Sequence, residues 1–156
     1  MNHQNSGLDL EDQADVIQEI ARSLVDEASG EWDLIRFVVN ATCEVSDFKS
    51  YVQERGSERA VFSPTSAIKL SRKLREAMYQ NGMGAWFIFT LDVSGDGAIS
   101  TTFNYDDEPH IDGLDPVVFL TEQELFPRDR ANQPDWFQER LTEGERLIAE
   151  RTTKEH

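Results

Sequence analysis

Apolar residues near the start of the chain recur with the spacing of one helical face. Ile17, Ile20, Ala21, Leu24 and Ala28 fall at positions i, i+3, i+4, i+7 and i+11. This stripe predicts an amphipathic helix from about Leu10 to Ala28, which Ser29-Gly30 then ends.

A second stripe predicts another helix in the middle of the chain. Its apolar positions are Ala67, Leu70, Leu74, Ala77 and Met78. Ser63-Pro64 fits a capping residue followed by a proline in the first turn, and Asn81-Gly82 fits the end of the helix. The other faces carry Lys69, Arg72, Lys73 and Arg75, which we expect to form a solvated surface.

Four stretches rich in β-branched and aromatic residues predict strands. They run over Trp32–Thr42, Glu44–Val52, Ala85–Leu91 and Ala98–Tyr105. The turn-rich segment Asp92–Gly97 separates the last two, so we expect a hairpin there.

The end of the chain predicts two more helices. A short one lies near Thr121–Phe126, and a last one runs from Pro134 to about Glu150. The main elements then follow the order α-β-β-α-β-β-α, which indicates an α+β fold: an antiparallel sheet of about four or more strands with helices packed on one face. Since no linker or repeat divides the chain, residues 8–150 form one predicted domain, and residues 1–7 and 151–156 are expected to be frayed tails.

Composition and charge narrow the class of protein. The chain has 156 residues, of which 38% are hydrophobic, enough for a folded core. Thirty Asp and Glu against fifteen Lys and Arg give a net charge of −15, which disfavours direct binding to nucleic acid or anionic lipid. There is no long apolar run and no signal-peptide pattern, and the single cysteine, Cys43, cannot form an internal disulfide. We therefore expect a cytoplasmic protein.

Few residues fit a catalytic or metal site. The Asp92–Gly97 segment matches the first half of a calcium loop, but Phe103 stands where that loop needs a glutamate, so a plain hairpin turn is favoured. His110 is the one histidine outside the predicted tails, and a zinc site needs several converging ligands. Cys43 lies beside a predicted strand and is expected to be a small buried hydrophobe. No catalytic residue, metal ligand or cofactor is predicted.

The acidic residues are unevenly distributed along the chain. Between Glu76 and Pro127 there are ten Asp and Glu but no Lys or Arg. The densest part, Asn104–His110, follows a predicted strand, where a rigid sheet can present a loop. Because a field of one sign steers partners of the opposite sign, this stretch predicts a surface for a basic partner. The plain alternative is a solvated loop with Tyr105 packed into the core.

The chain resembles a known family in this region. The features that carry the resemblance are Trp86–Thr90, Ser94–Gly97, Phe103–Pro109, Phe126–Asp129 and Pro134–Trp136, over roughly residues 84 to 140. They resemble the YezG-like immunity proteins of bacterial polymorphic toxin systems, which include antitoxins of secreted nucleases. The resemblance implies a small cytosolic protein that binds a toxin domain and blocks its active site or fold. The resemblance implies no catalytic residues for this chain.

The last two motifs also have a structural explanation. Pro127 fits the end of a helix, and Trp136 can staple the last helix to the sheet. Arg128 and Asp129 can form a local ion pair that fixes the loop between them.

We expect an immunity protein that neutralises a toxin by occluding its active site with an acidic surface. The predicted contact residues are Tyr105, Asp106, Asp107, Glu108, His110 and Asp112. A nuclease is the leading target because a site that binds phosphate is basic, and an NAD-degrading toxin is the alternative target. Two other classes stay open: a magnesium-assisted hydrolase that uses the crowded carboxylates, and an adaptor without a toxin. The segment Arg55–Phe62, which matches no motif, is a second candidate for a partner-specific surface.

Overall fold

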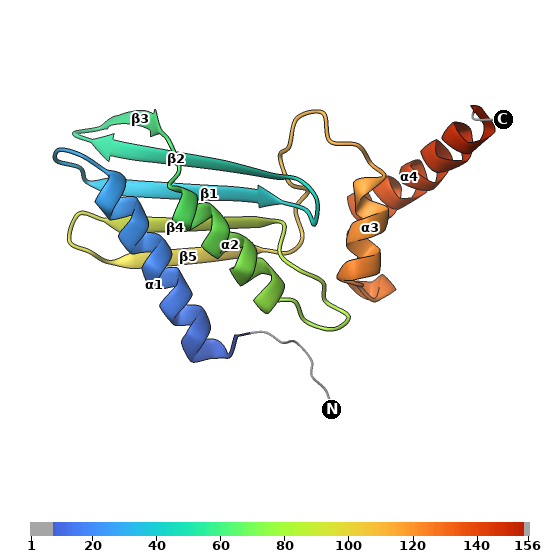
Figure 1. The fold of residues 1–156 in the computed structure, drawn as a ribbon, viewed down its shortest axis with the longest axis horizontal. Helices are drawn as coiled ribbons and strands as arrows, with labels where there is room; N and C mark the ends of the chain where they lie inside the picture. The colour runs from blue at the N-terminus through green and yellow to red at the C-terminus, as the bar shows by residue number, and fades with distance from the viewer. Residues whose placement is uncertain (1–7, 155–156) are drawn as a thin grey trace.

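The fold is a five-stranded antiparallel sheet with two helices across one face (Figure 1). The computed structural model describes residues 8–154. The strands are β1 (Leu34–Ala41), β2 (Ser46–Glu54), β3 (Ser57–Val61), β4 (Ile88–Ser94) and β5 (Ile99–Asn104), in the spatial order β3-β2-β1-β4-β5. The predicted α+β class and antiparallel sheet are confirmed.

Helices α1 (Leu10–Glu27) and α2 (Thr65–Ala77) cover the sheet and begin in different ways. Asp9 caps α1, because its carboxylate accepts a hydrogen bond from the backbone N–H of Asp12 at 2.8 Å. The predicted cap of α2 is wrong. The hydroxyl of Ser63 instead pairs with that of Ser50 on β2 at 2.7 Å, and α2 begins after Pro64 without a side-chain cap.

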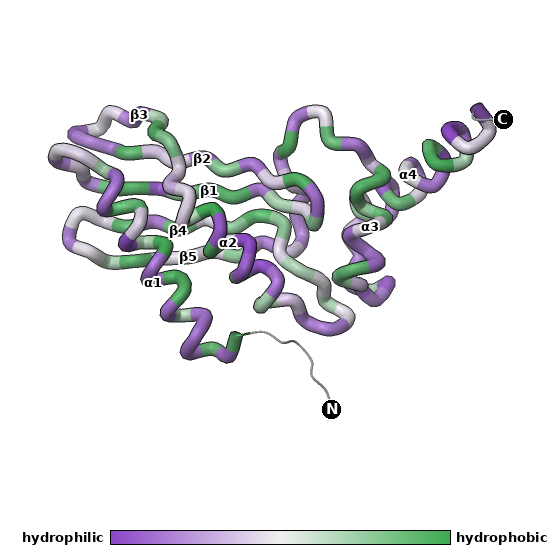
Figure 2. The backbone as a smooth tube through the Cα atoms, in the orientation of Figure 1, coloured by the Kyte–Doolittle hydropathy of each residue, from purple (hydrophilic) through white to green (hydrophobic). Residues whose placement is uncertain are grey.

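The main core lies between this helix pair and the central strands. Alternate residues of β1 and β4 point toward the helices, since side chains alternate between the two faces of a strand. Its buried members include Ile20, Leu24, Ile35, Phe37, Val39, Leu74, Trp86, Phe89, Leu91 and Val93. Figure 2 shows hydrophobic and hydrophilic residues alternating along these strands.

The C-terminal helices lie beyond one end of the sheet (Figure 1). They are α3 (Val118–Leu125), the short 3₁₀ helix η1 (Arg130–Asn132) and α4 (Asp135–Lys154). A second core of Phe87, Phe119 and Phe137 joins them to the approach to β4. Helices α1 and α2 pack on one face of the sheet, as predicted, whereas α3 and α4 share a hydrophobic core of their own. None of the helices in the described part of the chain is long and apolar enough to span a membrane.

Several elements differ from the sequence prediction; α3, for example, begins at Val118 and not near Thr121. Strand β3 was not predicted; it forms because Arg55 and Gly56 adopt positive φ and turn the chain back along β2. Strand β4 continues through Asp92 to Ser94, so the hairpin turn is shorter than expected. Helix α4 extends through residues 151–154, which were expected to be a tail, while residues 1–7 and 155–156 lie outside the described part.

Candidate functional site

The predicted contact residues lie on one loop, residues 105–112, which we call the acidic loop. It leaves the sheet at the end of β5, where Asn104 stands in register with Ile88 and, across β4, with Asn40 of β1. Asn40 and Asn104 therefore lie in one row at this end of the sheet, directly beneath the loop.

These two asparagines hold the backbone of the acidic loop. The Oδ1 of Asn104 accepts hydrogen bonds from the N–H groups of Asp106 and Asp107, each at 3.0 Å, and its Nδ2 donates to the Asp107 carboxylate at 2.8 Å. The Oδ1 of Asn40 accepts from the N–H of His110 at 2.8 Å. Such bonds fix a loop that would otherwise sample many conformations.

The segment that follows α3 holds the same loop from the other side. Trp136 Nε1 donates to the carbonyl of Asp106 at 2.6 Å, and Arg128 Nη2 donates to the carbonyl of Tyr105 at 2.7 Å. Arg140 contacts both oxygens of Glu108, at 2.6 and 3.1 Å, and these hydrogen bonds raise the pKa of Arg140. The loop is thus braced along most of its length.

The six predicted contact residues differ in exposure. Asp106, Asp107, His110 and Asp112 are exposed. Tyr105 is half-buried against the main core and its hydroxyl donates to the carbonyl of Met78 at 3.4 Å; burial raises its pKa. Glu108 is half-buried in its ion pair with Arg140. The surface left for a partner consists of the four exposed side chains.

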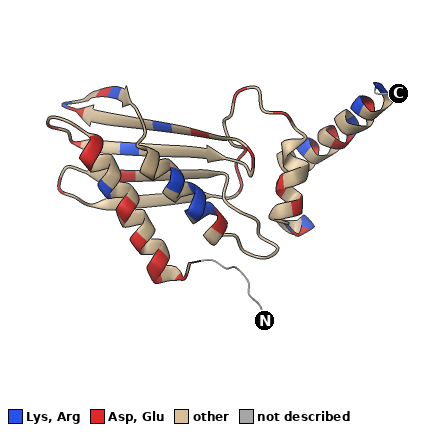
Figure 3. Ribbon diagram, in the orientation of Figure 1, with Lys and Arg blue, Asp and Glu red and all other residues tan. Residues whose placement is uncertain are grey.

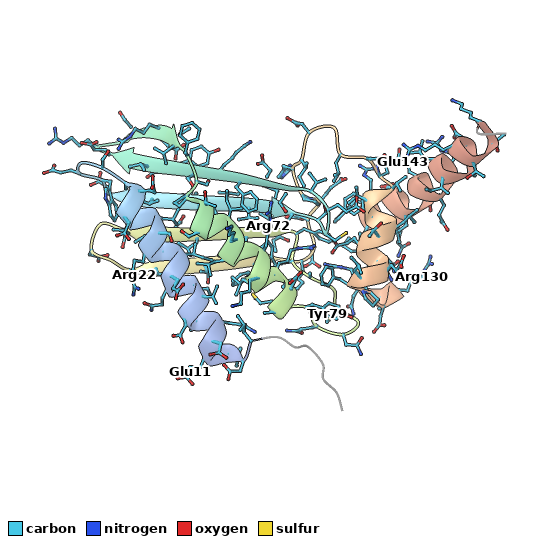
Figure 4. The ribbon with its side chains drawn as sticks, viewed as in Figure 1. Glu11, Arg22, Arg72, Tyr79, Arg130 and Glu143 are labelled. Carbon is cyan, nitrogen blue, oxygen red and sulfur yellow. The ribbon has the colours of Figure 1, made fainter. Side chains whose placement is uncertain are left out.

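A shallow depression of about 370 Å³ adjoins the acidic loop. It lies between Glu108 and Ile111 on the loop side and Arg140 and Glu143 on α4, where Glu143 is labelled in Figure 4. A partner that contacts the exposed carboxylates can place a side chain here.

The carboxylates of the region point toward different partners. Asp107 bonds to Asn104 and Glu108 to Arg140, while Asp115 accepts from Val117 N–H and pairs with Arg151, each at 3.0 Å. The hydrogen bond from Val117 holds the pKa of Asp115 below its usual value. Within residues 8–154, no three His, Cys, Asp or Glu side chains converge on a position that could hold a metal ion.

The Asp92–Gly97 segment comprises the end of β4 and most of the turn of the predicted hairpin with β5. Asp92 lies on the sheet and makes a bidentate ion pair with Arg36 of β1 at 2.8 and 2.9 Å. Asp96 accepts from the Ser94 hydroxyl and from the N–H of Ala98, and these bonds lower its pKa. The carboxylate of Asp92 is thus used in the sheet, and that of Asp96 within the hairpin.

Two arginines occupy positions that the sequence did not indicate. Arg75, expected on a solvated face, is buried and pairs with Glu122 of α3 at 2.7 Å. Arg128, expected to pair with Asp129, is also buried, and its guanidinium donates to the carbonyls of Ala85, Tyr105 and Asn132. Burial lowers the pKa of Arg128. Neither side chain is part of a solvated surface.

A second acidic surface was not recognised from the sequence. Helix α1 exposes the acidic residues Glu11, Asp12, Asp15, Glu19, Asp26 and Glu27. It packs beside α2, whose outer face carries Lys69, Arg72 and Lys73, so an acidic and a basic helix lie next to each other (Figure 3). The acidic residues of this surface alternate with the apolar stripe along residues 10–27.

Comparison of the chain with protein-family models and with curated proteins gives no match. The resemblance to YezG-like immunity proteins therefore stays a prediction.

Proposed function

We propose that this protein is an immunity protein, which binds a bacterial toxin and occludes its active site with the acidic loop. The observation that carries the proposal is the bracing of that loop. Five side chains from separate parts of the chain hold it: Asn40, Asn104, Arg128, Trp136 and Arg140. The carboxylates of Asp106 and Asp107 stay exposed to solvent.

A braced acidic loop suits the binding of a basic site. A loop that is already ordered loses less conformational entropy when it binds, so more of the contact energy contributes to affinity. Exposed carboxylates can form charge-assisted hydrogen bonds with the Arg and Lys side chains that bind phosphate. The net charge of −15 adds long-range attraction toward such a partner.

A nuclease is the proposed target, and an NAD-degrading toxin is the alternative target. Both kinds of enzyme bind phosphate groups, so both present the positive charge that the acidic loop complements. The sequence resemblance adds support for the nuclease.

The test measures binding of this protein to the polypeptide encoded by the neighbouring gene, at low and at high salt. The variant Asp106→Lys with Asp107→Lys reverses two exposed charges of the acidic loop. A matched control, Asp15→Lys with Glu19→Lys, makes the same change on the exposed face of α1. We expect tight binding by the unmodified protein, a loss of at least 100-fold in the loop variant, and little change in the control.

Either of two outcomes contradicts the proposal. Absence of binding to any encoded neighbour removes the immunity function. Binding that is lost in the α1 variant and kept in the loop variant assigns the interface to α1 instead.

A further inference from the structure

Strand β3 forms a free edge of the sheet. It pairs with β2 on one side, and in the described part of the chain no strand pairs with its other side. All five of its residues are exposed, and no helix covers it in Figure 1. An unpaired strand edge is a template for a further strand, because its outward backbone groups can form another ladder of hydrogen bonds.

The register of the sheet shows which backbone groups of β3 point outward. Ala41 donates its N–H to the carbonyl of Phe87 at 2.9 Å, so the odd-numbered residues of β1 bond to β4 and the even-numbered ones to β2. Carried through the β1–β2 and β2–β3 registers, this alternation makes Arg59 bond to β2. The N–H and C=O groups of Glu58 and Ala60 therefore point away from the sheet.

The end of this edge is apolar. Val61 is 37% exposed, and Phe62, which follows β3 directly, is 95% exposed. A depression of about 330 Å³ opens beside them, with Leu24 and Val52 among its walls. Exposed apolar groups that gather in one place, next to an unpaired edge, are typical of a surface that a second polypeptide covers.

The charge of this region favours a second copy of the chain over a basic partner. Residues 53–62 contain two Glu and two Arg, so the β2–β3 hairpin is neutral in a protein with a net charge of −15. Arg59 is held by Glu54 and by the carbonyl of Ser29, and Glu58 accepts from Gln53 at 3.0 Å. A basic partner is steered to the acidic surfaces instead, whereas a second acidic copy is repelled least at a neutral edge.

The sequence of β3 suits antiparallel pairing with itself about a two-fold axis at Ala60. The outward N–H and C=O groups of each Ala60 can then bond to those of the other. In that register the residues that face each other are Ala60 and Ala60, Arg59 and Val61, and Glu58 and Phe62. No two like charges stand opposite one another, whereas an axis at Arg59 or at Glu58 would oppose two like charges.

The other free edge, β5, suits a second copy less well. Ser94 donates its N–H to the carbonyl of Ala98, so Thr101 in the middle of β5 points outward. A two-fold axis at Thr101 would bring Asp96 opposite Asp106 of the other copy. Helix α1 also extends across β5 and beyond it in Figure 1, where a further strand would lie.

We propose that two copies of this protein associate through β3, with the two sheets joined in one continuous antiparallel sheet and Phe62 of each copy covered at the seam. The acidic loop follows β5, the opposite edge strand, so it stays free in the dimer. The inference does not depend on the proposed function.

The first test is sedimentation equilibrium of the full chain at concentrations up to about 1 mM, at low and at high salt. We expect a monomer–dimer equilibrium with a dissociation constant on the order of 100 μM, because a short strand buries little surface. Salt should tighten the dimer at least threefold, since it screens the repulsion between two copies of charge −15. Binding of a basic partner to the acidic loop would respond to salt in the opposite direction, which separates the two proposals.

A second readout locates the interface without any substitution. In proton–nitrogen correlation spectra, the amide signals of Glu58 and Ala60 should shift with protein concentration. The outward amides of Thr101 and Phe103 on β5 serve as the internal control and should not shift.

Two variants and a control test the contacts. Ala60→Pro removes an N–H that the monomer does not use in its sheet, and should weaken the dimer at least 10-fold. Phe62→Ser changes a side chain that is almost fully exposed in the monomer, and should weaken the dimer several-fold. Leu10→Ser makes the same kind of change on α1, where Leu10 is 83% exposed, and should have no effect. Circular dichroism reports whether each variant is folded.

The proposal is overturned if the protein stays monomeric at about 1 mM at both salt concentrations. A concentration-dependent shift of Thr101 and Phe103 in place of Glu58 and Ala60 would assign the interface to β5 and overturn it as well. Equal losses in Leu10→Ser and Phe62→Ser would show unspecific association of apolar side chains, with the same consequence.

Discussion

The Arg75–Glu122 ion pair connects α2 to α3 inside the protein. The two side chains are 6% and 1% exposed, their charged atoms lie 2.7 Å apart, and Glu122 also accepts the backbone N–H of Cys43 at 2.8 Å. Loss of one partner leaves the other charge buried and uncompensated. We expect Glu122→Gln to lower the free energy of unfolding by about 3–5 kcal/mol, measured by urea denaturation.

A surface pair provides the control for this prediction. Glu150 pairs with Arg146 on the exposed side of α4, and Glu150→Gln should cost no more than about 0.5 kcal/mol. The double variant Arg75→Met with Glu122→Leu removes both buried charges and should recover most of the loss. Equal costs for Glu122→Gln and Glu150→Gln would show that the buried pair has no special role.

Gly84 stands where a side chain would meet buried Arg128. It has φ of +81°, and an added Cβ would lie 2.5 Å from the Nε of Arg128, whose side chain is held by several carbonyls. Gly30 has a similar φ, +78°, but open space around it. We expect Gly30→Ala to cost about 1 kcal/mol through backbone strain alone, and Gly84→Ala to cost roughly 1–3 kcal/mol more through the clash. Thermal unfolding of both variants measures the difference, and similar costs would contradict a rigid Arg128.

The thiol of Cys43 should resist ionisation in the folded protein. Burial, followed by the negative charges of Glu122 and Glu44, raises its pKa from 9.0 to about 12. Since the thiolate is the reactive form, we expect iodoacetamide at pH 9 to alkylate the folded protein roughly 20-fold or more slowly than the urea-unfolded chain, after allowance for the greater nucleophilicity of a high-pKa thiolate. Equal rates would show that the thiol is solvated.

The raised pKa of Cys43 makes the stability of the folded protein depend on pH. The folded state binds the thiol proton more tightly than the unfolded state, whose pKa is near 9. The stabilisation of the folded state that comes from the protonated Cys43 thiol is therefore fully present below pH 9 and is lost as the pH rises toward 12. Cys43→Ser should reduce the loss of stability above pH 9.

At the scale of elements, the acidic loop takes its shape from α4 as much as from β5. Trp136 packs edge-on against Phe87 with ring centroids 5.1 Å apart and donates its N–H to the loop. Trp136→Phe keeps an aromatic ring and the charge of the protein but removes that hydrogen bond. We expect faster hydrogen exchange at the backbone amides of residues 105–108 and weaker partner binding, with stability lowered by only about 1 kcal/mol. Unchanged exchange would show that the hydrogen bond of Trp136 is not needed to hold the loop.

Elements with a strong apolar period could be predicted from the sequence, and those without one could not. The stripe of α1 and the strand around Phe37 gave boundaries close to those observed, while the strand around Phe89 was predicted three residues too early at both ends. Strand β3 has no apolar period because every residue from Ser57 to Val61 is exposed; its place is fixed by the turn at Arg55-Gly56 and by pairing with β2. Local patterns do not encode such pairing.

The residues of the candidate site also fall into two groups: those that could be predicted from the sequence and those that could not. Its carboxylates are consecutive in the chain, so charge alone located Asp106 and Asp107. The side chains that brace the loop come from distant segments: Asn40 bonds to His110 across 70 positions, and Arg140 reaches Glu108 across 32. Arg75 was placed on a solvated face because the partner that buries it, Glu122, belongs to another helix. Only the folded chain brings these groups together.

For the whole molecule, the charges are separated into regions. The net charge is −15, yet Lys69, Arg72 and Lys73 form a basic face on α2 while the acidic loop and α1 are acidic. A basic toxin should therefore be steered toward the acidic surfaces rather than toward α2. Electrostatic steering raises association rates by about 10- to 1000-fold at low salt, and added salt screens it over roughly 10 Å.

If the proposed function holds, salt should act mainly on the rate of association. The exposed carboxylates attract the partner at long range, while the braced backbone and the short contacts determine how long the complex lasts. We expect the association rate constant to fall at least 10-fold from low to high salt and the dissociation rate constant to change by less than about threefold, measured by stopped-flow fluorescence. In Asp106→Lys with Asp107→Lys the salt dependence of association should flatten, whereas Lys69→Glu with Lys73→Glu should steepen it. A salt effect confined to dissociation would mean that the charges act within the complex, and that apolar contacts bring the two proteins together.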